Sequence, residues 1–388
     1  MIPYSRQSIS EEDIKEVNRV LRSDFLTQGP EVPLFEKNLS SYFEAKHAIC
    51  CSSGTAALHL AYASLGANKE SVTIVPAITF VSTANASRHL GSKIIFCDVD
   101  PVSGIISIDH LEKILEESAK SEAVKNGFIC PVSLAGKTAP LDHIHDLAQK
   151  YKFSLIEDAS HAFGARTDRK DSAKIIRSGD CNLVDAACLS FHPVKHLCCG
   201  EGGVLLTNCD KIATKARRLR SHGIQRTHDQ NHDRPWFYEQ VDLGWNYRMT
   251  DIQAALGNSQ IKRIDESIRK RREIAKRYHD AFSEPKFTER FSPPVMEDGH
   301  AWHLYVIRFH QAKDRDQAYK FLIKRGIMSQ IHYIPLYRHP YYQKSSPTEP
   351  LLGAETYFER CLSIPLYPEL NQTEQTEVIE ALSDFISG

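Results

Sequence analysis

The chain has 388 residues, of which 41% are hydrophobic and 25% charged, and its formal net charge is −1. This balance is that of a soluble globular protein and gives no overall field toward nucleic acid or an anionic membrane. No apolar run approaches the roughly 18 residues of a membrane helix. The N-terminus lacks the apolar core of a signal peptide. We therefore expect a cytoplasmic protein without nucleic-acid or membrane partners.

The first predicted element is an amphipathic helix over residues 10–22. Ser10 provides an N-cap, acidic residues fill the first turn, and the apolar residues from Ile14 to Leu21 share one face. The helix ends before a turn at residues 27–30, "TQGP".

Seven short β-rich segments then alternate with helical patterns. Several are apolar on both faces, as required of a strand that helices cover on both sides. The alternation predicts an α/β fold with a doubly wound, mostly parallel, seven-stranded sheet. Ligands bind such sheets beyond the carboxyl ends of the strands. The segments are residues 47–51, 72–76, 93–99, 127–132, 153–158, 186–191 and 202–207.

The pattern changes near residue 250, which divides the chain into a large domain over residues 1–250 and a small C-terminal α/β domain over residues 251–388. The small domain opens with a long helix over residues 251–282, with a bend expected at Gly257. The polar stretch 221–240 before it is predicted to be a long exposed loop.

The remaining elements of the small domain are two strands and two helices. The "RKRRE" run within the long helix is interpreted as its solvated face rather than a nucleic-acid surface. The predicted elements are a strand at 303–309, a helix at 315–326, a strand at 328–334 and a helix after Asn371.

Three strand ends carry side chains suited to chemistry. The first strand ends in "SSGT", and the free N–H groups of Gly54, Thr55 and Ala56 at the following helix N-terminus form an anion site. Asp158 ends the fifth strand, where a carboxylate would face a ligand. Taken singly, each feature is also typical of an ordinary helix cap.

The third strand end is "SFHPVKH", in which Ser190 closes a strand and Lys195 follows a proline-stiffened turn. A lysine alone is more often a surface cation. Together, an anion cradle, a carboxylate and an amine at three strand ends are the parts that pyridoxal phosphate needs.

Six motifs in order, "SSGTAALHL", "PAITFVSTANA", "IEDASHAFGA", "SFHPVKH…GEGG", "RSHGI" and "GWNYRMTDIQAALG", resemble the DegT/StrS nucleotide-sugar aminotransferases. That family belongs to the fold type I pyridoxal-phosphate enzymes. The resemblance extends from "TQGP" to "IPLYPEL", nearly the whole chain. It implies that Lys195 is the catalytic lysine, joined to pyridoxal 5'-phosphate as an aldimine. It also implies that Asp158 pairs with the ring nitrogen.

The same resemblance places Ser190 and the backbone of residues 54–56 at the cofactor phosphate. Phe80 matches the aromatic residue that stacks on the cofactor ring, and His161 the residue that meets its ring hydroxyl. Asn246 matches a residue that reaches the phosphate in the neighbouring subunit, which implies a homodimer with shared active sites.

Within the family, residues 131–137 and 330–342 look most like the 4-aminotransferases of the pseudaminic acid pathway. This resemblance implies transfer of an amino group from L-glutamate to C4 of a UDP-4-keto-6-deoxy-N-acetylhexosamine. The candidate substrate residues are Thr27, Gly29, His222, Arg226, His332 and Tyr333.

One departure from the family pattern is Cys198-Cys199, where threonines usually precede "GEGG". These and the other eight cysteines are expected to be buried, reduced thiols. No metal site is expected, since the histidines at 222, 228 and 232 fit no usual ligand spacing.

Two other functions of the same fold remain open. One is a sugar dehydratase, in which histidine replaces the lysine, and the other is a regulator that has lost catalysis. Retention of Lys195 with Asp158, His161 and Ser190 argues against both.

Overall fold

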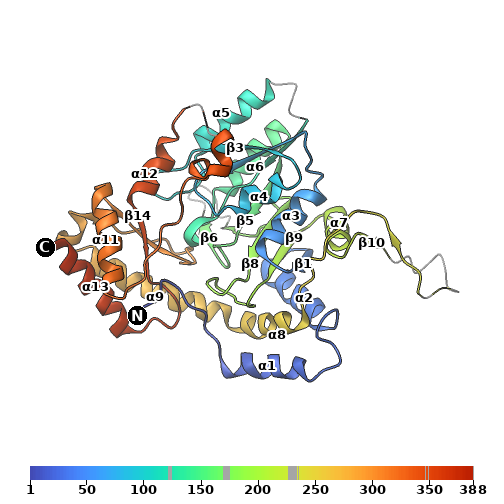
Figure 1. Ribbon diagram of the computed structural model, residues 1–388, viewed down its shortest axis with the longest axis horizontal. Helices are drawn as coiled ribbons and strands as arrows, with labels where there is room; N and C mark the ends of the chain where they lie inside the picture. The colour runs from blue at the N-terminus through green and yellow to red at the C-terminus, as the bar shows by residue number, and fades with distance from the viewer. Residues whose placement is uncertain are drawn as a thin grey trace.

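The computed structural model describes residues 1–120, 125–168, 175–225, 234, 236–345, 347 and 349–387. Its centre is a seven-stranded sheet with the order β1-β9-β8-β5-β4-β2-β3 (Figure 1). Strand β9 runs antiparallel to both of its neighbours, and the other neighbouring pairs are parallel. The predicted α/β fold with a mostly parallel sheet is therefore confirmed. The strands are β1 (His47–Cys51), β2 (Ser71–Pro76), β3 (Lys93–Cys97), β4 (Asn126–Ile129), β5 (Ser154–Asp158), β8 (Ala186–Ser190) and β9 (Gly203–Thr207).

Helices cover this sheet, and its strands are almost wholly buried. Burial on both faces explains why the strand segments lack a polar alternation. Because β1, β2, β5 and β8 run in the same direction, their carboxyl ends meet at one edge. The helices of this unit are α2 (Glu31–Phe43), α3 (Gly54–Ser64), α4 (Ser82–Arg88), α5 (Ile108–Ala119), α6 (Leu141–Tyr151) and α7 (Asp210–Arg220).

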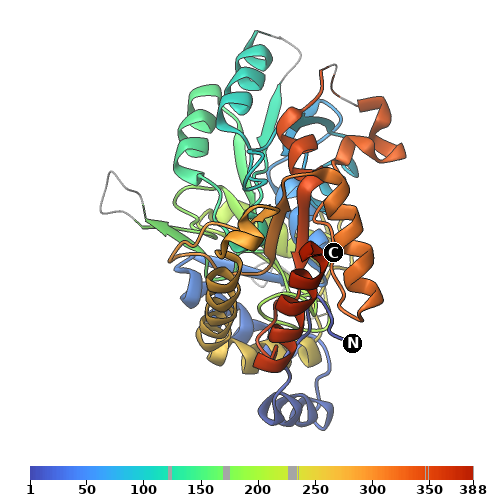
Figure 2. The same cartoon turned by 90° about the vertical axis from the view of Figure 1, so that its left-hand side faces the viewer.

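A second hydrophobic core lies beneath a three-stranded antiparallel sheet, β12-β13-β14, at the left of Figure 1. Figure 2 brings α11 and α13 of this unit toward the viewer. Ile2 belongs to this second core and bridges to Ile327, so the first residues pack with the C-terminal unit. The proposed division at residue 250 stays a prediction. The elements are α9 (Ile264–Phe282), α10 (Pro285–Thr288), β12 (Phe291–Ser292), β13 (Tyr305–Phe309), α11 (Ala312–Lys324), α12 (Leu352–Arg360), β14 (Cys361–Ile364) and α13 (Gln372–Ser387).

The predicted bend at Gly257 is wrong. Gly257 lies inside the regular helix α8 (Asp251–Gln260), and the break falls in a 3-10 turn over Ile261–Arg263. A Cβ on Gly257 would lie 2.5 Å from Phe35 Cζ and 2.9 Å from Cys199 Sγ. Glycine is needed here for close packing, not for a bend.

The strand predicted at 328–334 is also not formed. Its one ladder contact is a bridge from Gln330 to Ser363 of β14. Residues 330–334 instead line the main pocket of the molecule. In sequence, a pocket-lining segment with alternating polar and apolar residues cannot be told from a strand with one solvent-exposed face.

The basic run 269–273 is not wholly the solvated face of α9. Arg271 is fully buried, and its Nη1 donates to the carbonyls of Trp302, His303 and Leu366 at 3.3–3.4 Å. Burial lowers the pKa of its guanidinium to about 9. The arginine thus ties the chain before β13 to the segment after β14.

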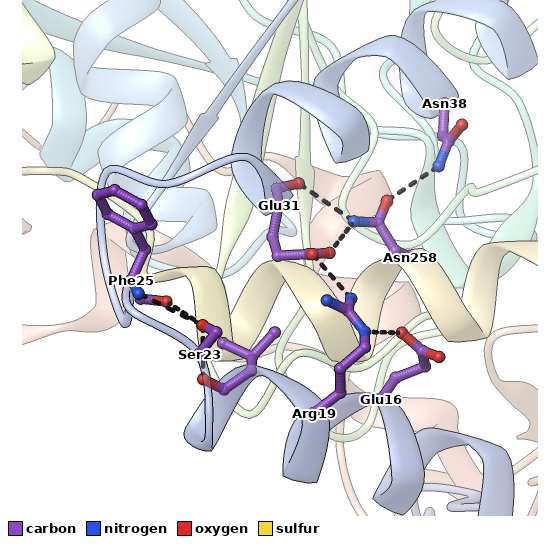
Figure 3. Close-up of polar contacts among 8 residues, drawn as sticks. Glu16, Arg19, Ser23, Phe25, Glu31, Asn38 and Asn258 are labelled. Atoms are coloured by element: carbon purple, nitrogen blue, oxygen red, sulfur yellow. Dashed lines mark hydrogen bonds and ion pairs between the residues drawn. The ribbon is translucent and has the colours of Figure 1, made fainter.

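The N-terminal helix α1 (Glu11–Leu21) has the predicted cap, a capping box between Ser10 and Asp13. Its apolar face is only partly covered, since Ile14 is 43% and Leu21 52% exposed. A polar network fixes the helix to its neighbours (Figure 3): Arg19 pairs with Glu31 at 2.7 Å. Asn258 of α8 donates to the Glu31 carbonyl and carboxylate, and accepts from Asn38.

The polar stretch 221–240 forms an arm in the described part. Strands β10 (Ile224–Gln225) and β11 (Glu239–Gln240) pair antiparallel, and the arm projects from the large unit at the right of Figure 1. No helix among the described residues is long and apolar enough to cross a bilayer.

Candidate active site

A cavity of about 750 Å³ opens at the carboxyl edge of the large sheet. The segments that follow β1, β2, β5 and β8 line it on one side, and residues 330–334 line it on the other. It therefore lies where an open α/β sheet binds its ligands. Of the candidate residues, those in its wall are Gly54, Thr55, Phe80, Asp158, His161, Ser190, Lys195, His332 and Tyr333.

The anion cradle lies between β1 and β8. Ser53 caps α3, and its hydroxyl accepts from the Ala56 N–H at 3.1 Å. The Ala56 N–H thus has a partner within the helix cap, and its place at the phosphate stays a prediction. The N–H groups of Gly54 and Thr55 are bonded to no described group and remain available. A Cβ on Gly54 would lie 2.8 Å from Ser190 Cβ, so glycine lets the helix N-terminus reach Ser190.

Lys195 reaches the same cavity from the turn after β8. Its N–H donates to the His192 carbonyl at 2.9 Å, which closes the turn that Pro193 stiffens. Burial lowers the pKa of the Lys195 amine to about 8, although the Asp158 carboxylate partly opposes this shift. An amine that loses its proton near neutral pH is suited to nucleophilic attack and to proton transfer.

The lowered pKa predicts how Lys195 reacts. Only the neutral amine attacks an aldehyde, so its reaction rate with pyridoxal phosphate follows the deprotonated fraction. With a pKa of about 8, that rate should rise about tenfold from pH 7 to pH 9 and then level off.

A lysine with an ordinary pKa of about 10.4 would instead gain about 100-fold over this interval and continue upward. Stopped-flow absorbance, with borohydride trapping and peptide mapping to Lys195, measures the profile. A rate that still climbs steeply beyond pH 9 would contradict it.

Asp158 is the buried carboxylate of the cavity, with 4% of its surface exposed. Its Oδ2 accepts from the Thr83 hydroxyl at 2.7 Å, and its Oδ1 accepts from the Ser160 N–H at 3.1 Å. Thr79, which also lines the cavity, lies 2.7 Å from Thr83 Oγ1. Each carboxylate oxygen thus has a donor from the protein.

His161 connects the two walls of the cavity. Its Nδ1 accepts from the Ala135 N–H at 3.4 Å, so the Nε2 carries the proton and donates to the Tyr333 hydroxyl at 3.1 Å. Burial, followed by the nearby Lys195 charge, holds the pKa of His161 well below its usual value. The imidazole is therefore neutral, and the Tyr333 proton is free to donate elsewhere.

Phe80 and His332 complete this wall. Phe80 is 55% exposed despite following a buried strand, so a ring face is open to the cavity. Its nearest aromatic contact is Tyr333, at 6.0 Å between ring centroids. His332 is held by Ser363 at 2.9 Å, and burial lowers its pKa to about 3.

The other candidate residues that the structure describes are not part of this wall. Thr27 bridges to Thr250 beneath the "TQGP" turn, and Asn246 bridges to Ser221 at the base of the arm. A Cβ on Gly29 would lie 2.1 Å from Asp251 Oδ2, which gives this glycine a packing role. His222 is exposed near the arm, and Arg226 lies outside the described residues.

The two cysteines before "GEGG" do not face the cavity. The Cys198 thiol accepts from the Gly200 N–H, and Cys199 packs in the main core against α8. All ten cysteines are free thiols, and nine are buried. No group of three possible metal ligands occurs among the described residues; two histidines of the rejected trio, at 228 and 232, lie outside them.

Sequence patterns missed several residues of the cavity wall. Thr79 lies in this wall and was not singled out, nor was Thr83, which lies behind the wall and contacts Asp158. The others follow no pattern and come from distant segments: Tyr4, His192, Glu201, Gln330 and His339.

The comparisons with known proteins agree with this arrangement. A family model described as "DegT/DnrJ/EryC1/StrS aminotransferase family" matches residues 7–383. The chain is 36% identical over 396 residues to the "Spore coat polysaccharide biosynthesis protein SpsC" of Bacillus subtilis, covering 100% of this chain and 97% of the relative. It is 35% identical to the "UDP-4-amino-4,6-dideoxy-N-acetyl-beta-L-altrosamine transaminase" of Campylobacter jejuni, covering 98% and 96%.

Solved structures match over the whole chain. "Helicobacter pylori PseC, aminotransferase involved in the biosynthesis of pseudoaminic acid" has a TM-score of 0.88 at 30% identity, covering 100% of this chain and 99% of that one. A sugar aminotransferase from Streptococcus pneumoniae, described as putative and in its PLP form, has a TM-score of 0.86 at 26% identity, covering 100% and 98%.

Proposed function

The chain belongs to the DegT/DnrJ/EryC1/StrS aminotransferase family, a family of PLP-dependent nucleotide-sugar aminotransferases, and we propose that it aminates C4 of a UDP-4-keto-6-deoxy-N-acetylhexosamine, with L-glutamate as amino donor. The observation that carries the chemistry is the partly buried Lys195 amine, which shares one cavity with Asp158 and the cradle at Ser190. The choice of sugar is supported by the Campylobacter jejuni and Helicobacter pylori relatives.

The cavity fits pyridoxal phosphate in its donors and its shape. The N–H groups of Gly54 and Thr55, with the Ser190 hydroxyl, would hold the phosphate at the α3 N-terminus. Asp158 would hold the ring nitrogen, and Phe80 would cover a ring face. His161 would meet the ring hydroxyl, and Lys195 would bind the aldehyde carbon. When bound, the cofactor supplies an electron sink for charge that develops at the reacting carbon.

The protein's own contribution is to hold the reacting groups in place and to move a proton. Lys195 Nζ would accept the proton from the α-carbon of glutamate and, in the second half-reaction, deliver a proton to C4 of the sugar. Its lowered pKa makes the neutral amine available near neutral pH, as a base that accepts and returns a proton requires. His332 and Tyr333 would line the sugar side of the cavity.

A homodimer with shared sites forms part of the proposal. No arginine is found among the described residues that line the cavity, yet a diphosphate and a donor carboxylate both require cations. The partner's Asn246 and the partner's His222, from the base of the arm, together with the partner's Arg226, would supply the missing polar groups. The exposed apolar residues of α1 and of the segment after the arm, such as Leu21 (52%) and Leu243 (85%), support burial in an interface.

Mixed dimers test the sharing of sites. Lys195→Ala and Asn246→Asp chains should each form inactive homodimers, because one lacks the amine and the other places an anion at the phosphate. An isolated mixed dimer carries one intact site, so about half of the wild-type activity should return. Mixed dimers as inactive as their parents would show that each chain builds its own site.

Two alternatives concern the substrate and the reaction. The Bacillus subtilis relative is named for spore coat polysaccharide biosynthesis, so a nucleotide keto-sugar other than the one proposed is a serious candidate for the substrate. A dehydratase of the same fold has histidine in place of Lys195, and a regulator would keep its lysine-bound cofactor in the presence of glutamate.

A spectroscopic cycle tests the proposed function. The protein loaded with pyridoxal phosphate should absorb in the visible range, lose that band with glutamate, and regain it with one UDP-4-keto-6-deoxy sugar. The sugar that restores the band identifies the substrate. A band indifferent to glutamate would overturn the aminotransferase proposal and favour a regulator.

A further inference from the structure

Asp158 is the end of a buried chain of hydroxyl groups that the reaction as described does not use. Thr83 Oγ1 lies 2.7 Å from Asp158 Oδ2, and Thr79 Oγ1 lies 2.7 Å from Thr83 Oγ1. The three side chains are 4% exposed or less. Both threonines therefore make these contacts with almost no competition from water.

The direction of the protons in this chain follows from its carboxylate end. An ionised carboxylate only accepts hydrogen bonds, so Thr83 must donate its single proton to Asp158. Thr83 can then only accept from Thr79, which donates in turn. Both O–H dipoles point toward Asp158, and the Ser160 N–H adds a third donor on Oδ1.

The same turn is fixed mechanically. Tyr62, which is fully buried, donates to the Thr83 carbonyl at 3.3 Å. Thr83 lies in the first turn of α4, three residues after Phe80. The hydroxyl chain is therefore held in one geometry by β2, α3 and α4.

Donors to an ionised carboxylate stabilise its charge and reduce its affinity for a proton. Successive donors strengthen one another in a chain. When a base forms a hydrogen bond with such a carboxylate, the proton between them therefore stays on the base. If Asp158 faces the ring nitrogen, as the proposed function requires, the hydroxyl chain decides where that proton stays.

We propose that the Thr79–Thr83 hydroxyl pair acts through Asp158 to keep the ring nitrogen of bound pyridoxal phosphate protonated, which makes Thr83 a positioning residue. The inference rests on the proposed function. A protonated nitrogen makes the ring a stronger electron sink. Loss of the Thr83 hydroxyl should shift the proton toward Asp158 and slow removal of the glutamate α-proton.

The test uses pyridoxal phosphate labelled with ¹⁵N in the ring and bound to the full-length protein. The ¹⁵N chemical shift distinguishes a protonated from a neutral ring nitrogen directly. In Thr83→Val, which keeps the shape but removes the donor, the signal should move toward the neutral value. The glutamate half-reaction should slow about tenfold, as expected for loss of one hydrogen bond to a charged group.

Three further variants separate this role from a purely structural one. Thr83→Ser keeps the hydroxyl and should restore the protonated signal. Thr79→Val leaves the Thr83 donor in place and should move the signal in the same direction by a smaller amount. Thr73→Val is the matched control, since it removes a buried hydroxyl bonded to Ser87 at 2.5 Å on the same strand and helix, away from Asp158.

The outcomes are distinguishable. A Thr83→Val protein with the wild-type nitrogen signal, or a Thr73→Val protein with the same shift as Thr83→Val, would overturn the inference alone. If Thr83→Val does not fold, an unshifted signal in Thr79→Val overturns it. Wild-type protein that takes up no cofactor would overturn the proposed function and the inference together.

Discussion

Lys195→Ala is expected to lower the rate of amino transfer by about 10⁴-fold or more, since it removes the covalent anchor and the proton carrier at once. The protein should still bind pyridoxal phosphate, because the cradle at Gly54 and Ser190 and the Asp158 carboxylate remain. Absorbance of the loaded variant should lack the visible band of a lysine-bound cofactor. Steady-state kinetics and spectra of the loaded protein measure both effects.

Two controls test whether the loss of activity and of the visible band is specific to Lys195. Lys137→Ala removes a lysine that is paired with Glu297 away from the cavity, and it should leave the spectrum unchanged. Small primary amines added to Lys195→Ala should restore part of the proton transfer, because they can occupy the space left by the side chain. If Lys195→Ala retains the visible band, another amine holds the cofactor.

The large sheet could be predicted because its strands are buried on both faces. The seven apolar segments are flanked by turn residues, five of them are followed by a helix, and all seven formed strands. The elements of the small unit were harder to predict, because their sequence patterns are weaker and fit more than one structure. Gly257 is a flexible residue in a helix pattern, but packing against Phe35 decided its conformation.

The segment 328–334 shows a second limit. Its alternation has the period of a strand, but the residues that should pair with it, in β14, were not distinguishable from a loop in sequence. Arg271 shows a third limit of prediction, because its charge alone indicated an exposed side chain. Three backbone carbonyls that meet only in the folded chain hold it in the core.

The site residues that could be predicted are those that lie at, or just after, the carboxyl end of a predicted strand. Ser190, Lys195 and Asp158 each end or follow a strand, and parallel strands bring such residues to one edge. The Ala56 N–H was not predictable, because the choice of Ser53 as its partner depends on cap geometry. Thr83 was not recognised, because its partner is 75 residues away.

Asp158→Asn is expected to weaken both cofactor binding and catalysis. An amide keeps the shape and can accept from Thr83, but it supplies no negative charge to a ring nitrogen. A hydrogen bond to a charged group contributes about 1.5–3 kcal/mol, so the Kd for pyridoxal phosphate should rise about 10- to 100-fold. The glutamate half-reaction should slow by about 100-fold or more, since the unprotonated ring is a weaker electron sink.

Glu157→Gln is the matched control for Asp158→Asn. The two carboxylates are neighbours on β5 and point to opposite faces of the sheet. Glu157 accepts from the hydroxyls of Ser133 and Ser178 and from the Gly179 N–H, away from the cavity. An amide there would replace a carboxylate that accepts three hydrogen bonds by a group with one acceptor oxygen, and would cost about 1–3 kcal/mol of stability.

The two substitutions should therefore separate folding from chemistry. Glu157→Gln should lower the midpoint of denaturant unfolding and leave the cofactor spectrum and Kd as in the wild type. Asp158→Asn should leave the unfolding midpoint of the cofactor-free protein nearly unchanged. It should raise the Kd for the cofactor and alter the spectrum of the loaded protein. Equal effects of the two variants on Kd would mean that burial of charge in β5, rather than a contact from Asp158 to the ring, governs cofactor binding.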